Sequence, residues 1–162
     1  MIRLKAKQAD TPIHQAAEIL YRLCFILGAI FAVAMTWIVI INIVSRYFLN
    51  YAISWAEEVS RYLMVWMVML GAAMGVRSGL HFRMEMIEHR VGMTLKASFH
   101  WASRIVSFLI GFILLWHGCI LLPLTNYQYA TATQIPMSWV YISLPLSGIL
   151  MIFFVIEQSL KR

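Results

Sequence analysis

The sequence predicts an all-α, polytopic membrane protein with four transmembrane helices, and two observations lead to this fold class. The first is composition: of 162 residues, 62% are hydrophobic and 12% are charged, whereas a soluble domain usually carries about 25% charged residues. The second is the absence of Asp, Glu, Lys and Arg from 23–45, 62–76 and 105–156. A spanning helix needs roughly 20 apolar residues, so the last stretch is long enough for two helices.

The first transmembrane helix is predicted at about residues 20–47. Thr11 and Pro12 form an N-cap followed by proline at the first helical position, and apolar residues then recur at helical spacing. We therefore expect a short amphipathic segment at 12–19 that lies on the cytoplasmic surface and leads into the helix. The uncharged run continues to Ser45, well past a signal-peptide core of about 7–15 residues, which indicates a retained helix.

The second transmembrane helix is predicted at about 55–76, in a tight antiparallel hairpin with the first because the connection is short. Ser54 and Glu57 have the spacing of a capping box, in which each side chain satisfies a free backbone N–H of the other residue. Gly71 and Gly75 have the small-xxx-small spacing that lets another backbone approach closely. This spacing predicts close helix packing without naming the partner.

The second half of the chain is predicted to begin with a short interfacial helix at about 84–91, where apolar residues share one face. The third transmembrane helix follows at about 94–122, with Pro123 as its stop. It would be roughly 43 Å long, beyond a hydrocarbon core of about 30 Å, so it should tilt or project into the cytoplasm. The fourth is predicted at about 137–156. We expect a single membrane domain over 1–162.

Lys and Arg residues gather in alternate connections. The N-terminal region to residue 22 has four, the 77–104 region five and the C-terminus two, whereas the 46–54 loop has one and the 123–137 loop none. By the positive-inside rule, both termini and the 77–104 connection are predicted to be cytoplasmic. Because these cations lie at helix ends, the net charge of +6 does not indicate nucleic-acid binding.

A charged group at the outer end of the first hairpin is the main candidate site. Glu57, Glu58 and Arg61 open the second helix, and Arg46 ends the first, so Arg46 should come within reach of Glu57 or Glu58. Such exposed pairs contribute at most about 1 kcal/mol each. Two interpretations stay open, a local ion pair and a contact with a partner protein. With Trp55, Gly71 and Gly75, these residues are the candidate assembly contacts.

The chain by itself lacks the features of a transporter, an enzyme or a metal protein. Transporters usually hold substrate at paired helix breaks near the midplane, and proton-driven ones carry an acidic residue there; this sequence shows neither. Of five histidines only His117 is well inside a predicted helix, where a helix-packing hydrogen bond is a better explanation than haem. No catalytic or metal-binding motif is present, and we expect no cofactor on this chain.

Five stretches of the sequence resemble the small membrane subunit of tripartite ATP-independent periplasmic (TRAP) transporters. The resemblance implies that a periplasmic receptor captures an organic acid or acidic sugar, such as sialic acid. A large membrane subunit then moves this solute together with sodium, in a bacterial inner membrane, and the small subunit acts as a scaffold without a substrate site. The alternative is a membrane anchor for haem or quinone in a redox complex. The stretches are NIVSRYFLN (42–50), SWAEEVSRYLMVW (54–66), LGAA (70–73), GLHFR (79–83) and IPMSWVYISLP (135–145).

Overall fold

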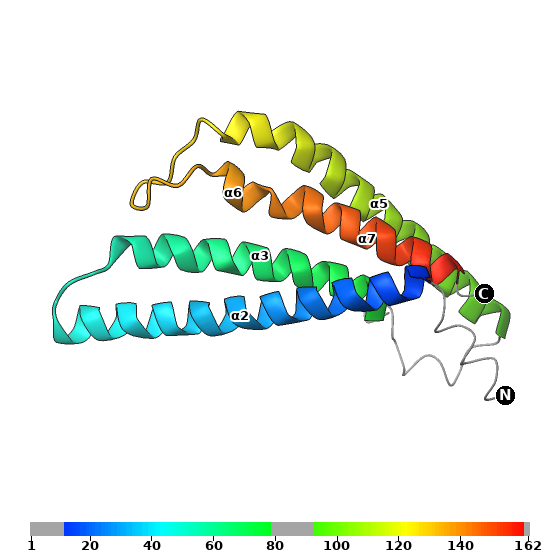
Figure 1. Cartoon of the computed structure of the whole chain (residues 1–162), viewed down its shortest axis with the longest axis horizontal. Coiled ribbons are helices and arrows are strands. Elements are labelled where there is room, and N and C mark those ends of the chain that lie inside the picture. The colour runs from blue at the N-terminus through cyan, green and yellow to red at the C-terminus, as the bar shows by residue number, and fades with distance from the viewer. Residues whose placement is uncertain (1–11, 79–92, 161–162) are drawn as a thin grey trace.

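The computed structural model describes residues 12–78 and 93–160, with side chains described over 12–78 and 101–160. Four of its helical stretches are long and apolar enough to cross a membrane, which confirms the predicted fold class. The predicted interfacial helix at 84–91 lies outside the described residues. The helices are α2 (Pro12–Phe48), α3 (Ser54–Ser78), α5 (Met93–Thr125), α6 (Ser138–Tyr141) and α7 (Ser143–Leu160) (Figure 1).

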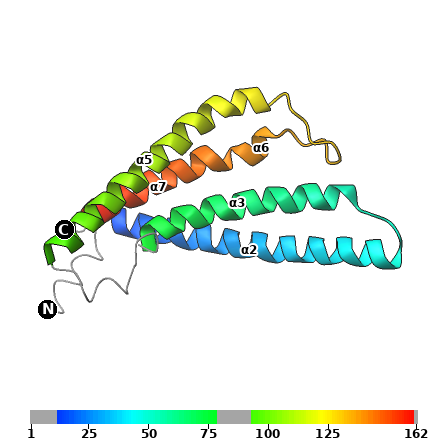
Figure 2. The ribbon, with the colours of Figure 1, turned by 180° about the vertical axis from the view of Figure 1, so that it is seen from behind.

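The helices form two antiparallel hairpins that pack side by side. Helix α2 pairs with α3, α5 pairs with α6 and α7, and α3 packs against α7, so the spatial order is α2, α3, α7, α5 (Figures 1 and 2). We call the end where α2 begins and α7 ends the terminal end, and the opposite end the loop end. The two hairpins lie close together at the terminal end and diverge toward the loop end.

Helix α2 is longer than the sequence predicts, because it begins at Pro12 and not near residue 20. Its 37 residues span about 55 Å at about 1.5 Å per residue. Ala17 is fully buried, and Leu20 packs against the core. The prediction of a separate surface segment at 12–19 is therefore wrong: these residues continue α2 and pack against the other helices.

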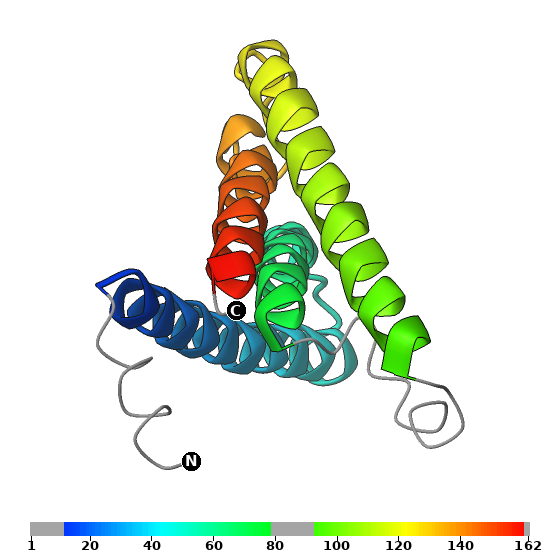
Figure 3. The ribbon, with the colours of Figure 1, turned by 90° about the vertical axis from the view of Figure 1, so that its right-hand side faces the viewer.

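Helix α5 also extends past its predicted end, through Pro123 to Thr125. The Thr125 hydroxyl donates to the carbonyls of Leu121 at 3.0 Å and Leu122 at 3.2 Å. These bonds satisfy carbonyl oxygens that a helix end otherwise leaves free, and the helix ends three residues later than expected. In the view along the bundle from the terminal end, α5 is clearly inclined to α7 (Figure 3).

The fourth span is divided into α6 and α7, with Ile142 between them, and ends at Leu160, four residues beyond its predicted end. The Ser143 hydroxyl donates to the Val140 carbonyl at 2.7 Å across the junction. Pro145 lies in the first turn of α7, where its missing N–H has no helical acceptor to lose. The division therefore falls near the loop end, and the rest of α7 is continuous.

Helices α5 and α7 pack closely at glycines that the sequence analysis did not single out. A Cβ atom on Gly148 would lie 2.6 Å from the Gly111 carbonyl oxygen and 2.7 Å from the Leu115 nitrogen. A Cβ atom on Gly71, by contrast, would have nothing within 4 Å. Gly71 thus does not pack closely against another helix of the described chain. The predicted close packing at Gly71 would require a helix of another protein.

Candidate functional site: polar contacts at the two ends of the bundle

Glu58, in the first turns of α3, accepts four hydrogen bonds from the loop that joins α5 to α6. The Thr131 hydroxyl donates to Glu58 Oε1 at 2.6 Å, and the Ala132 N–H donates to the same oxygen at 2.9 Å. The N–H and the hydroxyl of Thr133 both donate to Oε2 at 3.0 Å. We call this contact the Glu58 clamp. It connects the two hairpins at the end where they diverge.

Two backbone hydrogen bonds close the base of the loop that carries these donors. The Ala130 N–H donates to the Ile135 carbonyl at 3.0 Å, and the Met137 N–H donates to the Gln128 carbonyl at 2.8 Å. Gln134 adopts a positive φ of 55°, the left-handed conformation that reverses a chain tightly. Residues 131–133 therefore form the tip of a closed loop whose donors converge on one carboxylate.

The hairpin between α2 and α3 is tight, as predicted. The Ser45 hydroxyl donates to the Tyr51 carbonyl at 2.8 Å, and the Ile53 N–H donates to Asn42 Oδ1 at 3.2 Å. Arg46 comes 3.9 Å from Glu57, but both side chains are more than half exposed. The expected approach of Arg46 to Glu57 or Glu58 is thus confirmed for Glu57, as a loose surface pair.

The predicted capping box at the start of α3 is wrong. Among the side chains that the structure describes, Ser54 and Glu57 do not make the reciprocal capping bonds. Helix α3 already includes Ser54, and its first turn is closed by the Ala56 N–H donating to the Ile53 carbonyl at 3.1 Å. The Glu57 side chain points toward Arg46 across the hairpin instead.

A second polar cluster, at the terminal end, was not foreseen from the sequence. Arg77 Nη2 lies 2.9 Å from Glu18 Oε2, and Arg77 Nε lies 3.3 Å from Glu157 Oε2. Nδ1 of His14 lies 2.8 Å from Oε1 of Glu157. We call these four residues the ionic joint. It connects α2, α3 and α7, and Arg22 extends it outward through a 3.1 Å contact with Glu18.

The sequence contains a signal for the ionic joint. Four antiparallel spans place Glu18, Arg77 and Glu157 at the same membrane boundary, since each lies beside an uncharged stretch that ends on that side. Acidic and basic residues at one boundary can pair between helices. The spacing of residues along one helix does not show which residues of different helices meet at that boundary.

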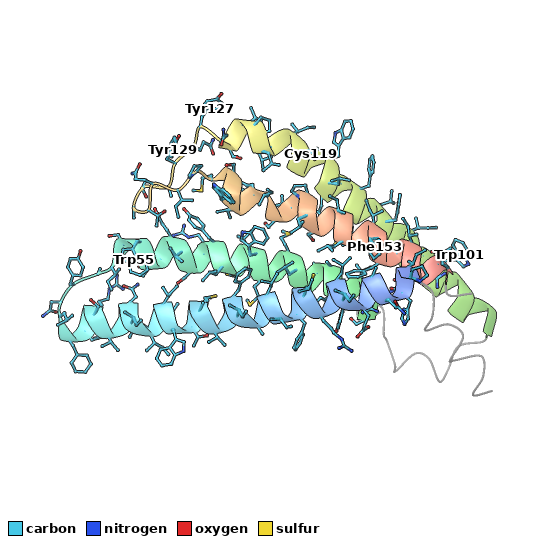
Figure 4. The ribbon with its side chains drawn as sticks, in the orientation of Figure 1. Trp55, Trp101, Cys119, Tyr127, Tyr129 and Phe153 are labelled. Carbon is cyan, nitrogen blue, oxygen red and sulfur yellow. The ribbon has the colours of Figure 1, made fainter. Side chains whose placement is uncertain are left out.

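The remaining candidates do not form a site within the described residues. His117 is exposed on α5 and makes no helix-packing hydrogen bond in this part of the chain. Cys24 is buried and Cys119 exposed, and both are free thiols. The described residues contain no group of three or more His, Cys, Asp or Glu side chains that could hold a metal ion. Figure 4 shows Trp55 at the start of α3, with Tyr127 and Tyr129 on the opposite loop.

Comparison with known proteins identifies the family. The family "Tripartite ATP-independent periplasmic transporters, DctQ component" matches residues 35–162, which include the tight hairpin, the Glu58 clamp and all of α7. This chain belongs to the DctQ component family of TRAP transporters. It is therefore a small permease subunit of a multi-component transporter and a multi-pass inner-membrane protein, and it is not an enzyme.

Individual relatives agree with this assignment. The TRAP subunit is 25% identical over 149 residues to a TRAP transporter small permease protein of Haemophilus influenzae, covering 92% of this chain and 88% of that one. It is 26% identical over 141 residues to the sialic acid TRAP transporter small permease protein SiaQ of Vibrio cholerae, covering 82% and 74%. It also matches the sialic acid permease protein SiaT of Haemophilus influenzae at 24% identity, but spans only 22% of that longer relative.

Proposed function

We propose that this subunit is the scaffold on which a large membrane subunit carries out sodium-coupled uptake of a carboxylate-bearing solute delivered by a periplasmic receptor. The solute class is supported by the relatives, whose names refer to C4-dicarboxylates and to sialic acid, compounds that share a carboxylate. The match to the much longer SiaT supports a large membrane subunit as the partner. In this proposal sodium and solute bind to the large subunit, and this chain binds no cofactor.

The placement of charge is the observation that carries the scaffold role. The Glu58 clamp lies at the loop end and the ionic joint lies at the terminal end, and the stretches 23–45, 62–76 and 105–156 between them contain no charged side chain. A subunit that moved an anion and a cation through itself would need polar groups in these stretches. Both polar clusters instead join helix to helix or helix to loop, as a rigid support requires.

Exposed aromatic side chains support contact with the bilayer at the loop end. Trp and Tyr are enriched at membrane interfaces, where an apolar ring meets the polar headgroups. We propose that the loop end faces the periplasm and that both termini are cytoplasmic, in agreement with the positive-inside rule. The exposed aromatic residues at this end are Tyr47, Phe48, Tyr51, Trp55, Tyr127, Tyr129 and Trp139.

One face of α3 is the proposed assembly surface for a helix of the large subunit. Glu57, Arg61, Met64 and Val68 follow at helical spacing and are exposed, and Gly71 continues the stripe with open space above its Cα. Gly75 is one turn further on and Trp55 stands at the head of the same helix. Small residues let a partner backbone approach closely in a membrane, and the charged side chains of Glu57 and Arg61 at the head of the stripe would fix its orientation.

Glu58 contributes to assembly through the loop that it holds. Because its carboxylate already accepts four hydrogen bonds from residues 131–133, a direct contact with a partner is not needed to explain an acidic residue here. In this proposal the clamp fixes the position of the 126–137 loop on the periplasmic side, and the loop in turn forms part of the surface that the receptor or the large subunit meets.

Reconstitution into liposomes tests the scaffold proposal. The purified chain alone should show no sodium-driven uptake of sialic acid or of a C4-dicarboxylate. Addition of the large subunit from the same transporter and its receptor should restore uptake of one carboxylate-bearing solute. Uptake by the isolated chain, or full activity of the large subunit without it, would contradict the scaffold role.

The assembly surface has its own test, Gly71→Leu. The new side chain enters space that is open within this chain, so the isolated subunit should fold and insert normally. Co-purification with the large subunit in mild detergent should fall sharply, because the partner backbone could no longer approach. Ala29→Leu, at an exposed position on α2, is the matched control. Equal co-purification of the two variants would place the interface elsewhere.

A further inference from the structure

The Arg77–Glu157 pair at the centre of the ionic joint is buried, although both groups are ionisable. The Glu157 side chain is 2% exposed and that of Arg77 10%. The guanidinium carbon of Arg77 lies 5.0 Å from the centre of the Tyr21 ring and 5.8 Å from the centre of the Phe154 ring. Arg77 is therefore covered by aromatic rings of α2 and α7 while its donors reach one carboxylate on each of these helices.

The backbone at the end of α3 is held at the same point. Gln158 Nε2 donates to the Val76 carbonyl at 2.7 Å and to the Arg77 carbonyl at 3.1 Å. The last carbonyls of a helix have no intrahelical donor, so α7 supplies one from outside. Glu157 and Gln158 thus recognise both the side chain and the backbone of one short segment of α3.

In a membrane, contacts between polar groups can favour one packing of the helices over the alternatives. Apolar helix faces gain little by leaving lipid, because acyl chains are as apolar as Leu or Ile. A buried carboxylate or guanidinium without its partner is unfavourable in that environment. Glu157 and Arg77 are therefore both satisfied only when α7 docks on α3 in this register, whereas the apolar contacts alone would tolerate a slide or a rotation.

We propose that the ionic joint determines how the two hairpins dock, with Arg77 as the positioning residue that aligns α7 and the first turns of α2 against α3. The joint acts by selecting one register, and it is not required for the helices themselves to form. This inference concerns the chain's own packing and does not depend on the proposed transport role.

Cross-linking of the full chain in bacterial membranes tests the proposal. Cys24 and Cys119 are replaced by Ala, and cysteines are placed at Met69 and Ser147, where the Ser147 hydroxyl donates to the Met69 carbonyl at 2.9 Å. These positions report docking of α7 on α3 and lie outside the joint. Oxidation with copper phenanthroline, which forms a disulfide without a spacer, then gives a cross-link yield for each variant, relative to the unaltered joint.

Arg77→Ala should lower the cross-link yield roughly tenfold, since it leaves Glu157 buried without its arginine partner. Arg61→Ala, on the same helix but exposed, is the matched control and should leave the yield unchanged. The double variant Arg77→Leu/Glu157→Leu should recover much of the yield, because no unpaired charge remains at the contact between α3 and α7. The cross-link yield of Arg77→Lys, which keeps the charge, should lie between the yields of Arg77→Ala and the parent.

Two outcomes would overturn the proposal. One is a yield for Arg77→Ala equal to that of Arg61→Ala. The other is an Arg77→Leu/Glu157→Leu variant whose loss of yield equals the product of the losses of Arg77→Leu and Glu157→Leu made separately, since independent effects would show that Arg77 and Glu157 do not act as a pair. If Arg77→Ala fails to accumulate in the membrane, Arg77→Lys and Glu157→Gln give the same comparison with milder changes.

Discussion

At each end of this subunit a glutamate joins the two hairpins, but the two glutamates have different partners and different exposure to solvent. At the loop end, the carboxylate of Glu58 is held by neutral hydroxyl and amide donors from a loop, in a partly exposed position. At the terminal end, the carboxylate of Glu157 is 2% exposed and is held by arginine and histidine side chains from two helices. Each contact joins the α2–α3 hairpin to the second hairpin, but only the terminal one has a buried ion pair at its centre.

The two contacts differ in how much free energy is lost when they are broken, because solvent can reach one carboxylate and not the other. A partly exposed carboxylate that loses its partners can be solvated again, so the Glu58 clamp can be broken with little effect beyond the loop itself. A buried carboxylate or arginine that loses its partner keeps the desolvation penalty. The clamp should therefore tune the position of one loop, whereas the ionic joint should affect the whole bundle.

The largest expected effect comes from breaking the ionic joint. Glu157→Gln removes the charge opposite Arg77 while preserving size, and should destabilise the subunit by about 3–5 kcal/mol, the range for a broken buried ion pair. Unfolding of the purified subunit by denaturant in detergent measures this. A loss as small as that of an exposed pair would show that water reaches the joint and would remove the contrast between the two ends.

Breaking the Glu58 clamp should have an intermediate and local effect. Glu58→Ala removes the acceptor for the N–H groups of Ala132 and Thr133, so these amides should exchange hydrogen faster, while amides in the middle of α7 keep their protection. Hydrogen exchange with mass spectrometry resolves the two regions. Faster exchange throughout α7 would mean that the clamp, like the joint, supports the whole bundle.

The smallest effect is expected at the Arg46–Glu57 pair. The two groups are 3.9 Å apart and both are mainly exposed, so Arg46→Ala and Glu57→Ala should each change stability by no more than about 0.5 kcal/mol. The absence of capping bonds from Glu57 within the described residues removes the reason to expect a larger loss. A double-mutant cycle in detergent gives the coupling free energy of the pair. A value above about 1 kcal/mol would show that this exposed pair stabilises the subunit in the way expected of the ionic joint.

The sequence by itself determined the fold class, the approximate spans and the first hairpin. Uncharged stretches about 20 residues long predict spanning helices because the bilayer imposes that length, and the short connection between Arg46 and Ser54 required the two helices to be antiparallel neighbours. The contact between Arg46 and Glu57 followed from this geometry. The motifs of the hairpin and of the fourth span also indicated the family.

Only the tertiary structure decided which residues meet across the bundle. Glu58 binds residues more than 70 positions away, Arg77 joins Glu18 to Glu157, and Gly111 meets Gly148. These contacts depend on the rotation and register of each helix against its neighbours. Hydrophobic periodicity leaves both undefined in lipid, where the apolar faces of a helix are nearly equivalent; register is decided where polar groups or glycines from two helices fit together.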